Sequence, residues 1–368
     1  MCHFQGKTPG NTCVSIRRQQ LNILRQMAIK RETELDRYSA PSGLASAIGE
    51  TAALYGIDIV PICAALDIDP ATFSDLTGRI SLDRLCRLLE TCALIANDDM
   101  FGLKATEHFR SGSTGPYGYG LMAAPTALDF LRFLGEHQQY VSSKSYIKFT
   151  INEFSAEVEF SYSPLILKRN QYVDMGMALI LQRLRTILGS RTDFIEVGME
   201  RPKPKSQALY REKISRKVNF DRRVNSIKLP AELFSVRNPN GDPRLFRLMD
   251  LQCRSLRPPP QKEADFTEEL REFILSRISE SVISLSEAAE FFRVSERTLQ
   301  RRLADAGTSL NDTRDEVRRG LAEKLLAETD LSAAEIALRL GYSAPSAFTR
   351  STLRWFGKTP RDVRKAAV

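Results

Sequence analysis

The sequence predicts an α+β N-terminal domain followed by an all-α C-terminal domain. Apolar residues recur at helical spacing over most of the chain, but residues 145–163 alternate between apolar and polar side chains, as a β-hairpin does. Pro258, Pro259 and Pro260 indicate a linker, because three consecutive prolines do not fit inside a helix or a central strand. After these prolines only helical patterns occur, and they include an internal repeat. The length of 368 residues suits two or three domains.

Composition excludes several classes of protein. Hydrophobic residues make up 42% of the chain, which is enough for globular cores and excludes wholesale disorder. No run of about 18 apolar residues occurs, so we expect no membrane span, and the polar N-terminus shows no secretory signal. The six cysteines and three histidines are scattered, without the close spacings of a zinc site. We therefore expect a cytoplasmic protein that binds no metal and no cofactor.

Charge and proline patterns divide the chain into four parts. They are a polar extension, a first domain, a linker and a second domain, at residues 1–39, 40–257, 258–264 and 265–368. The extension has a helical pattern over Leu21–Arg31, and Met27 is an alternative start. Residues 201–262 hold 16 basic and 5 acidic side chains, a net charge of +11. This basic block could assist nucleic-acid binding, face an anionic small molecule or form a solvated surface.

Helical patterns dominate the first domain. Leu82, Leu85 and Leu88 share one helix face, and the glycine-rich segment 112–120 is predicted to be a loop between helices. That segment lacks the preceding strand and the following Lys-Ser/Thr of a phosphate-binding loop, which argues against nucleotide binding. The elements predicted after the hairpin are a helix ended by Gly189, two strands and a last helix, at residues 171–188, 193–199, 226–229 and 243–257.

The second domain contains two similar units. The first spans about residues 284–303 and the second about 332–356, and Ala289 and Ser295 match Ala337 and Ser343 at an offset of 48. A small residue in the first helix, a turn and a second helix form the pattern of a helix-turn-helix.

Each unit has the residues that this motif needs. In the second unit Gly341 suits a turn with positive φ, and Ser295 and Ser343 are predicted N-caps of the second helices. Leu299 and Phe348 are predicted to point inward.

The outward faces of the second helices carry groups that recognise DNA bases. Arg297, Gln300 and Arg301 project from one helix, and Ser346 and Arg350 from the other. Arginine pairs bidentately with guanine and glutamine with adenine in the major groove. The basic side chains of Arg302, Lys358 and Arg361 suit phosphates. The pattern therefore predicts sequence-specific DNA binding.

Residues 267–364 resemble the DNA-binding domain of the AraC/XylS transcription regulators. The segments that carry the resemblance are Ala334–Ala337, Gly341–Ser343, Phe348–Arg350, Trp355–Pro360 and Arg364. The resemblance implies a long connecting helix at Leu310–Glu328, with Val317, Leu321, Ala322 and Leu325 on its buried side.

It also assigns the DNA contacts. The base-reading residues would be Arg297, Gln300, Arg301, Ser346, Ala347 and Arg350. The phosphate contacts would be Ser295, Thr298, Arg302, Ser343, Thr349, Arg354, Lys358 and Arg361.

Three residues depart from the family pattern. Arg293 replaces the usual turn glycine of the first unit, Leu310 replaces a common aromatic residue, and Val363 replaces Tyr or Phe. None of these changes removes a DNA-facing group, so we expect altered packing without loss of function.

The first domain resembles the sensing domain of the ornithine-utilisation-regulator type within this family. Phe101–Leu103, Gly115–Tyr119 and Pro125–Leu128 carry this resemblance, which does not extend to the all-β sugar-binding barrel of the family's namesake. It implies a small-molecule effector of unknown identity and a homodimer, and it assigns no effector-binding residue.

Together these features predict an effector-responsive transcription activator whose recognition helices enter adjacent major grooves of promoter DNA, with RNA polymerase as a partner. One alternative is a dimeric DNA-binding regulator without a ligand. Another is an enzyme with a DNA-targeting domain, but Cys63 and Cys86 have no local base, and His108 and His137 form no triad pattern. We therefore expect no enzymatic activity.

Overall fold

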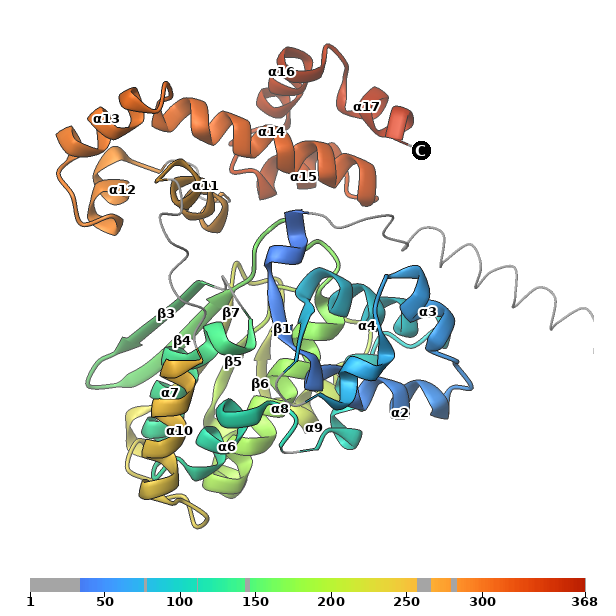
Figure 1. Cartoon of the computed structure of the whole chain (residues 1–368), viewed down its shortest axis with the longest axis vertical. Helices are drawn as coiled ribbons and strands as arrows, with labels where there is room; N and C mark the ends of the chain where they lie inside the picture. The colour runs from blue at the N-terminus through green and yellow to red at the C-terminus, as the bar shows by residue number, and fades with distance from the viewer. Residues whose placement is uncertain are drawn as a thin grey trace, which may run out of the picture. The chain divides into compact units, whose positions relative to one another are not determined.

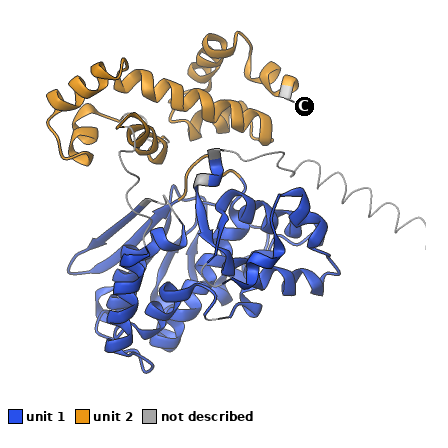
Figure 2. Ribbon diagram, viewed as in Figure 1, with its two compact units in different colours: residues 1–161, 168–257 blue, residues 162–167, 258–368 orange. Residues whose placement is uncertain are grey.

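The computed structural model describes residues 34–75, 78–110, 112–142, 146–256, 266–278 and 283–367. The chain forms two compact units (Figures 1 and 2). Unit 1 comprises residues 1–161 and 168–257, and unit 2 comprises residues 162–167 and 258–368. The helix predicted at 21–31 and the linker predicted at 258–264 lie outside the described residues.

A five-stranded sheet forms the β layer of unit 1. Its strand order is β3 (Tyr146–Ile151), β4 (Ser155–Ser161), β7 (Asn225–Pro230), β5 (Glu196–Gly198) and β6 (Lys217–Asn219). The predicted hairpin is confirmed as the antiparallel pair β3–β4, in which Phe149 lies opposite Val158. Buried and partly buried residues alternate along β4, so one face of the sheet packs on the core. A small sheet pairs β1 (Ser39–Pro41) with β2 (Arg79–Ser81).

Helices make up most of the rest of unit 1. They are α2 (Ser46–Leu54), α3 (Val60–Ala65), α4 (Leu82–Ala96), α5 (Phe101–Ala105), α6 (Gly115–Ala123), α7 (Ala127–Val141), α8 (Asn170–Leu188), α9 (Ala208–Lys213) and α10 (Pro243–Ser255). Helix α7 packs on β3 and β4, and α8 packs against α4 and α5. Gly189 ends α8 with a φ of +59°, as its predicted role as a helix stop requires. The unit is therefore a mixed α+β domain, as predicted.

The loop predicted at 112–120 is wrong, because residues Gly115–Ala123 form helix α6. Pro116 occupies the first turn, where a missing N–H is tolerated. Gly120 is required by packing, since a Cβ at this position would overlap the ring of Phe133 on α7. The glycines of this segment thus allow close helix contact and do not form a flexible loop.

No helix within the described ranges is long and apolar enough to span a membrane.

In the part that the structure describes, unit 2 is all-helical. Its helices are α11 (Phe266–Ser276), α12 (Leu285–Phe291), α13 (Glu296–Asp305), α14 (Leu310–Glu328), α15 (Ala333–Arg339), α16 (Pro345–Phe356) and α17 (Pro360–Ala367). The bounds of α14 are those predicted for the connecting helix. Its predicted inner residues Val317, Leu321, Ala322 and Leu325 are all buried.

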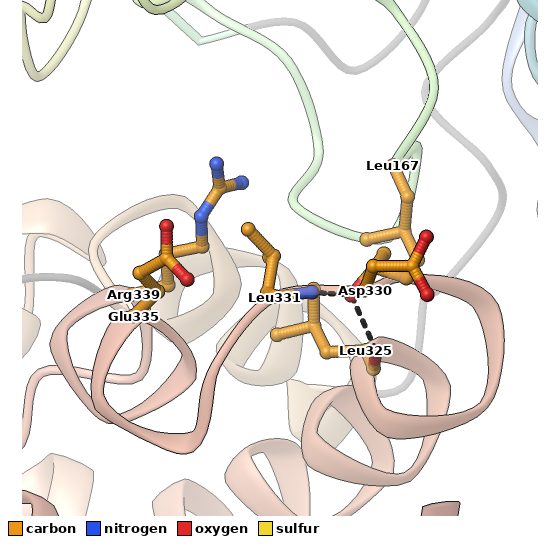
Figure 3. Close-up of a pocket in the computed structure, with 7 residues that line it drawn as sticks. Leu167, Leu325, Asp330, Leu331, Glu335 and Arg339 are labelled. Atoms are coloured by element: carbon orange, nitrogen blue, oxygen red, sulfur yellow. Dashed lines mark hydrogen bonds between the residues drawn. The ribbon is translucent and has the colours of Figure 1, made fainter.

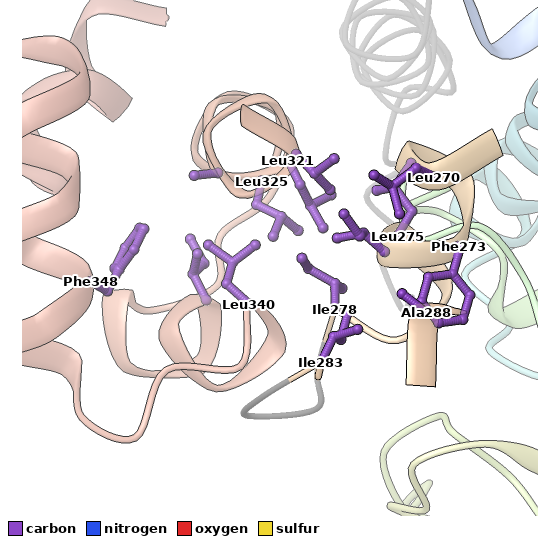
Figure 4. Close-up of a cluster of buried hydrophobic side chains, with 14 of the residues drawn as sticks. Leu270, Phe273, Leu275, Ile278, Ile283, Ala288, Leu321, Leu325, Leu340 and Phe348 are labelled. Carbon is purple, nitrogen blue, oxygen red and sulfur yellow. The ribbon is translucent and has the colours of Figure 1, made fainter. Parts of the chain in front are cut away.

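One hydrophobic core runs through both helix pairs of unit 2 (Figure 4). Phe273 and Ala288 belong to it at the first pair, Leu340 and Phe348 belong to it at the second, and Leu321 of α14 contributes between them. Because α12–α13 and α15–α16 share this core with α14, their relative orientation is determined by side-chain packing.

Candidate nucleic-acid interface

Both helix pairs of unit 2 begin with the same capping box. The Ser284 Oγ accepts a hydrogen bond from the Glu287 N–H at 3.1 Å, and the Glu287 carboxylate accepts one from the Ser284 N–H at 2.8 Å. Ser332 and Glu335 repeat this arrangement at 3.2 and 2.7 Å. These bonds hold the pKa of both glutamates below the usual value. The repeat seen in the sequence is therefore a repeat of local structure.

The two turns have the same left-handed backbone at equivalent positions. Gly341 has a φ of +71°, as predicted, and Arg293, 48 residues earlier, has a φ of +52°. A non-glycine residue in this region is strained by about 1 kcal/mol or more. Arg293 therefore keeps the turn geometry of the glycine that it replaces.

The second helices start differently. Ser295 is the N-cap of α13, and its Oγ accepts a hydrogen bond from the Thr298 N–H at 3.2 Å. The N-cap of α16 is Ala344, which makes no side-chain cap bond, so the cap predicted at Ser343 is wrong. The extra residue in the second unit moves the helix start by one position. Pro345 then occupies the first turn, where its fixed φ favours helix initiation.

The inward and outward faces of α13 and α16 match the predicted pattern. Leu299 and Phe348 are fully buried. Of the predicted base-reading side chains, Ala347 is half-buried. The others are exposed, and they are Arg297, Gln300, Arg301, Ser346 and Arg350. Each helix thus presents a polar row to solvent from a fixed apolar anchor.

The predicted phosphate contacts have different surroundings. Ser343, Lys358 and Arg361 are exposed. The Arg302 guanidinium lies 5.6 Å from the ring centroid of Phe266, and the Thr349 hydroxyl donates to the Pro345 carbonyl at 3.1 Å.

Three further predicted phosphate contacts, Ser295, Thr298 and Arg354, also have partners in the protein. The Ser295 hydroxyl is engaged in the cap described above, and it also contacts the Thr298 hydroxyl at 2.8 Å. Arg354 Nη2 donates to Asp315 of α14 at 2.5 Å.

The polar contacts that α14 makes with the second helix pair were not predicted from the sequence. Asp315 accepts hydrogen bonds from Arg354 and Trp355, and Arg318 donates to the carbonyls of Leu340 and Gly341. Arg318 was detectable, because it interrupts the apolar stripe of α14 directly after Val317. A charged residue on a buried face requires partners.

A pocket of about 350 Å³ lies in unit 2, where α14 ends and α15 begins (Figure 3). The residues that line it are Leu167, Leu325, Thr329, Asp330, Leu331, Glu335 and Arg339. None of them is a predicted DNA contact.

Unit 1 contains a buried ionic network that joins α8 to residues near α9. Arg201 forms an ion pair with Asp174, which is fully buried, and Nη2 of Arg201 contacts Asp99 at 2.9 Å. The Tyr210 hydroxyl donates to Asp174 at 2.6 Å. Burial raises the pKa of the Asp174 carboxyl to about 7, although the charge of Arg201 acts in the opposite direction.

The basic block 201–262 divides into paired and exposed side chains. Lys213 forms an ion pair with Glu107 at 2.7 Å, and Arg216 pairs with Asp193 at 3.1 Å. Lys205, Arg222 and Arg223 are exposed. The block is therefore partly a structural element of unit 1.

The cysteines proposed as candidate nucleophiles are unsuited to that role. Burial raises the pKa of the Cys63 thiol to about 11, and burial also raises the pKa of the Cys86 thiol. His137 Nε2 lies 2.7 Å from the Asp250 carboxylate, near Glu136. Each of these three groups offers one ligand atom within 4.8 Å of the others, but Arg254 forms ion pairs with both carboxylates. The pairing of α7 with α10 explains this cluster without a metal.

Two family models match the chain. Residues 56–238 match the arabinose-binding domain of AraC transcription regulators, and residues 288–366 match a helix-turn-helix domain. The ornithine utilization regulator of Pseudomonas aeruginosa is 23% identical over 89% of this chain and 96% of its own length. The transcriptional regulator VirS of Mycobacterium tuberculosis is 28% identical over 84% of this chain and 91% of its own length.

Among solved structures, the transcriptional regulator CdpR from Pseudomonas aeruginosa aligns with 20% identity and a TM-score of 0.35, over 87% of this chain and 98% of its own. The helix-turn-helix model matches the part of unit 2 that holds the two helix pairs, and the arabinose-binding model matches a part of unit 1 that is a mixed α+β domain and not an all-β barrel. The chain therefore belongs to the AraC family of DNA-binding transcription regulators.

Proposed function

We propose that this regulator reads specific DNA sequences through α13 and α16, which enter adjacent major grooves on one face of the duplex. The observation that carries the proposal is that both helices expose rows of polar and basic side chains while Leu299 and Phe348 anchor them in one shared core. A rigid unit with two such helices suits two recognition elements about one helical turn, or about 34 Å, apart.

The spacing of the exposed side chains supports this role. Arg297, Gln300 and Arg301 are related by i, i+3 and i+4, and Ser346 and Arg350 are related by i and i+4, so each set lies on one helix face. Arginine and glutamine at such positions match the base edges of the major groove.

The predicted phosphate contacts other than Arg354, transcription activation, an RNA polymerase contact and homodimerisation complete the proposal, because the family resemblance implies them.

Removing Arg350 tests base reading by α16. Arg350→Ala should weaken binding to the preferred site by about 1–3 kcal/mol and relax base preference at one position of the site, because a bidentate base contact is lost. Selection of bound sequences from a random DNA library, with wild type in parallel, measures this preference. Equal weakening on every sequence, together with a smaller salt dependence, would instead make Arg350 a phosphate contact.

We also propose that unit 1 binds a small-molecule effector, because it matches a domain named for ligand binding. A ligand that binds the folded chain should raise its melting temperature by about 5–10 °C when present at about 100 times its Kd. A thermal-shift screen of amino acids including ornithine, sugars including arabinose, and small aromatic compounds tests this expectation. The same ligand should change DNA affinity, since coupling between two sites is reciprocal.

The alternative without a ligand makes a different prediction. If unit 1 acts only in dimerisation, no compound in the screen will shift the melting temperature. The fraction of DNA bound will then change with protein concentration and not with any of these compounds.

A further inference from the structure

We propose that Asp315 and Arg318 of the connecting helix α14 are positioning residues that hold the second recognition helix, α16, in its DNA-reading orientation, and that Arg354 serves this clamp and not a DNA phosphate. The inference rests on the proposed function of α16. It assigns to three side chains a role that neither the family models nor the predicted contacts contain.

The first half of the clamp acts on the turn before α16. Arg318 is 9% exposed, and its Nε donates to the Leu340 carbonyl at 2.8 Å while Nη2 donates to the Gly341 carbonyl at 3.1 Å. These carbonyls end α15, where a cation also interacts favourably with the helix dipole. The same guanidinium lies 4.6 Å from the ring centroid of Tyr342. One side chain of α14 therefore fixes three consecutive residues of the turn.

The second half acts on the C-terminal part of α16. One carboxylate oxygen of Asp315 accepts a hydrogen bond from Arg354 at 2.5 Å, and the other accepts one from the Trp355 indole N–H at 2.8 Å. Asp315 and Arg318 are three residues apart, so they project from the same face of α14. Together they hold α16 at its entry and near its end, and Arg350 lies between these two points of attachment.

The Asp315–Arg354 pair also changes the role of Arg354. Their side chains are 41% and 64% exposed, so the pair itself adds little to folding stability. Its effect is geometric, because it reduces the freedom of α16 relative to α14.

Variants that replace one charged side chain by an uncharged side chain of similar size distinguish a clamp from a phosphate contact. Removing an acidic group near DNA should strengthen binding if electrostatics alone operate, but Asp315→Asn should weaken binding about tenfold if it loosens α16. The loss of base preference should be confined to the part of the site that α16 reads. Arg354→Met should have the same effect, and the double variant should be no weaker than either single variant, because both remove one interaction.

Glu316→Gln provides the matched control. It removes the same charge from the next position of α14, but Glu316 pairs with Arg271 of α11 at 2.8 Å and not with α16. This variant should bind DNA at least as tightly as wild type and retain base preference under α16. Unfolding followed by Trp355 fluorescence should show that all of these variants remain folded.

The experiment is a selection of bound DNA by the full chain, followed by titrations at several salt concentrations. The clamp predicts weaker, less selective binding under α16 for Asp315→Asn and an unchanged salt slope for Arg354→Met. Tighter binding by Asp315→Asn, or a salt slope reduced by about 0.9 in Arg354→Met, would overturn it. Failure of wild type itself to select any preferred sequence would contradict the proposed function and not the clamp alone.

Discussion

Phe348→Ala should eliminate reading by α16 and lower the free energy of unfolding of unit 2 by about 3–5 kcal/mol. Phe348 is fully buried, and its ring lies 5.8 Å from that of Tyr342. Alanine would leave a cavity where α16 contacts the shared core, and the helix would lose the anchor that orients its exposed face.

The chain provides its own probe for this measurement. Trp355 is the one tryptophan in the sequence and lies on α16, so denaturant unfolding followed by its fluorescence reports on unit 2. Leu353→Ala is the control, because Leu353 lies on the same helix but is 45% exposed and should change stability by less than about 1 kcal/mol. An unfolding curve for Phe348→Ala that coincides with wild type would contradict this account of the core.

Above about pH 7, where Asp174 is ionised, Arg201→Met should lower the free energy of unfolding of unit 1 by about 3–5 kcal/mol, because it leaves the fully buried carboxylate without its counter-ion. The Trp355 transition of unit 2 should be little changed. Far-UV circular dichroism, which follows the whole chain, should show an additional transition at low denaturant. This pattern is the reverse of that expected for Phe348→Ala.

The raised pKa of Asp174 also predicts how the stability of unit 1 changes with pH. Because burial raises the pKa of Asp174 to about 7, the folded state keeps a proton that the unfolded chain loses near pH 4. The stability of unit 1 should therefore fall as pH rises from about 4 to about 7. Asp174→Asn should remove this dependence.

Two further variants test whether an unpaired buried charge causes the loss of stability in Arg201→Met. Arg201→Met combined with Asp174→Asn should recover much of the lost stability, since no charge then remains buried. Arg216→Met is the matched control, because its pair with Asp193 is exposed and should contribute less than about 1 kcal/mol. Equal losses for Arg201→Met and Arg216→Met would argue against a special role for the buried pair.

The sequence predicted elements that depend on local patterns. Hairpin β3–β4 was predictable because apolar and polar residues alternate along one short segment. The family resemblance, and not periodicity, predicted the connecting helix α14. The capping boxes of α12 and α15 were not among the predictions, although Ser and Glu three residues apart are also local information.

One error arose where tertiary packing overrides local preference, and the other where one local preference overrides another. The glycines of α6 resemble those of a loop, but Gly120 is small because Phe133 packs against it. The start of α16 shifted to Ala344 because Pro345 favours the first helical turn over a serine cap one position earlier.

Long-range polar pairs were not predictable from one sequence. Asp174 and Arg201 are 27 residues apart, and Asp315 and Arg354 are 39 apart, with no spacing rule that connects them. For the same reason the sequence predicted the exposed side chains of α16 that we propose face DNA, but not the residues of α14 that contact this helix.

If α13 and α16 read DNA as one rigid pair, the distance between the two halves of the bound site must be fixed. Selection with wild type should return two preferred blocks separated by about one helical turn. Inserting about five base pairs between the blocks should weaken binding at least about tenfold, because one block then faces away from the protein. Inserting a full turn should not restore binding, since the 19-residue helix α14 fixes the separation. Affinity that is unchanged by either insertion would show that the two helices do not read DNA as one rigid pair.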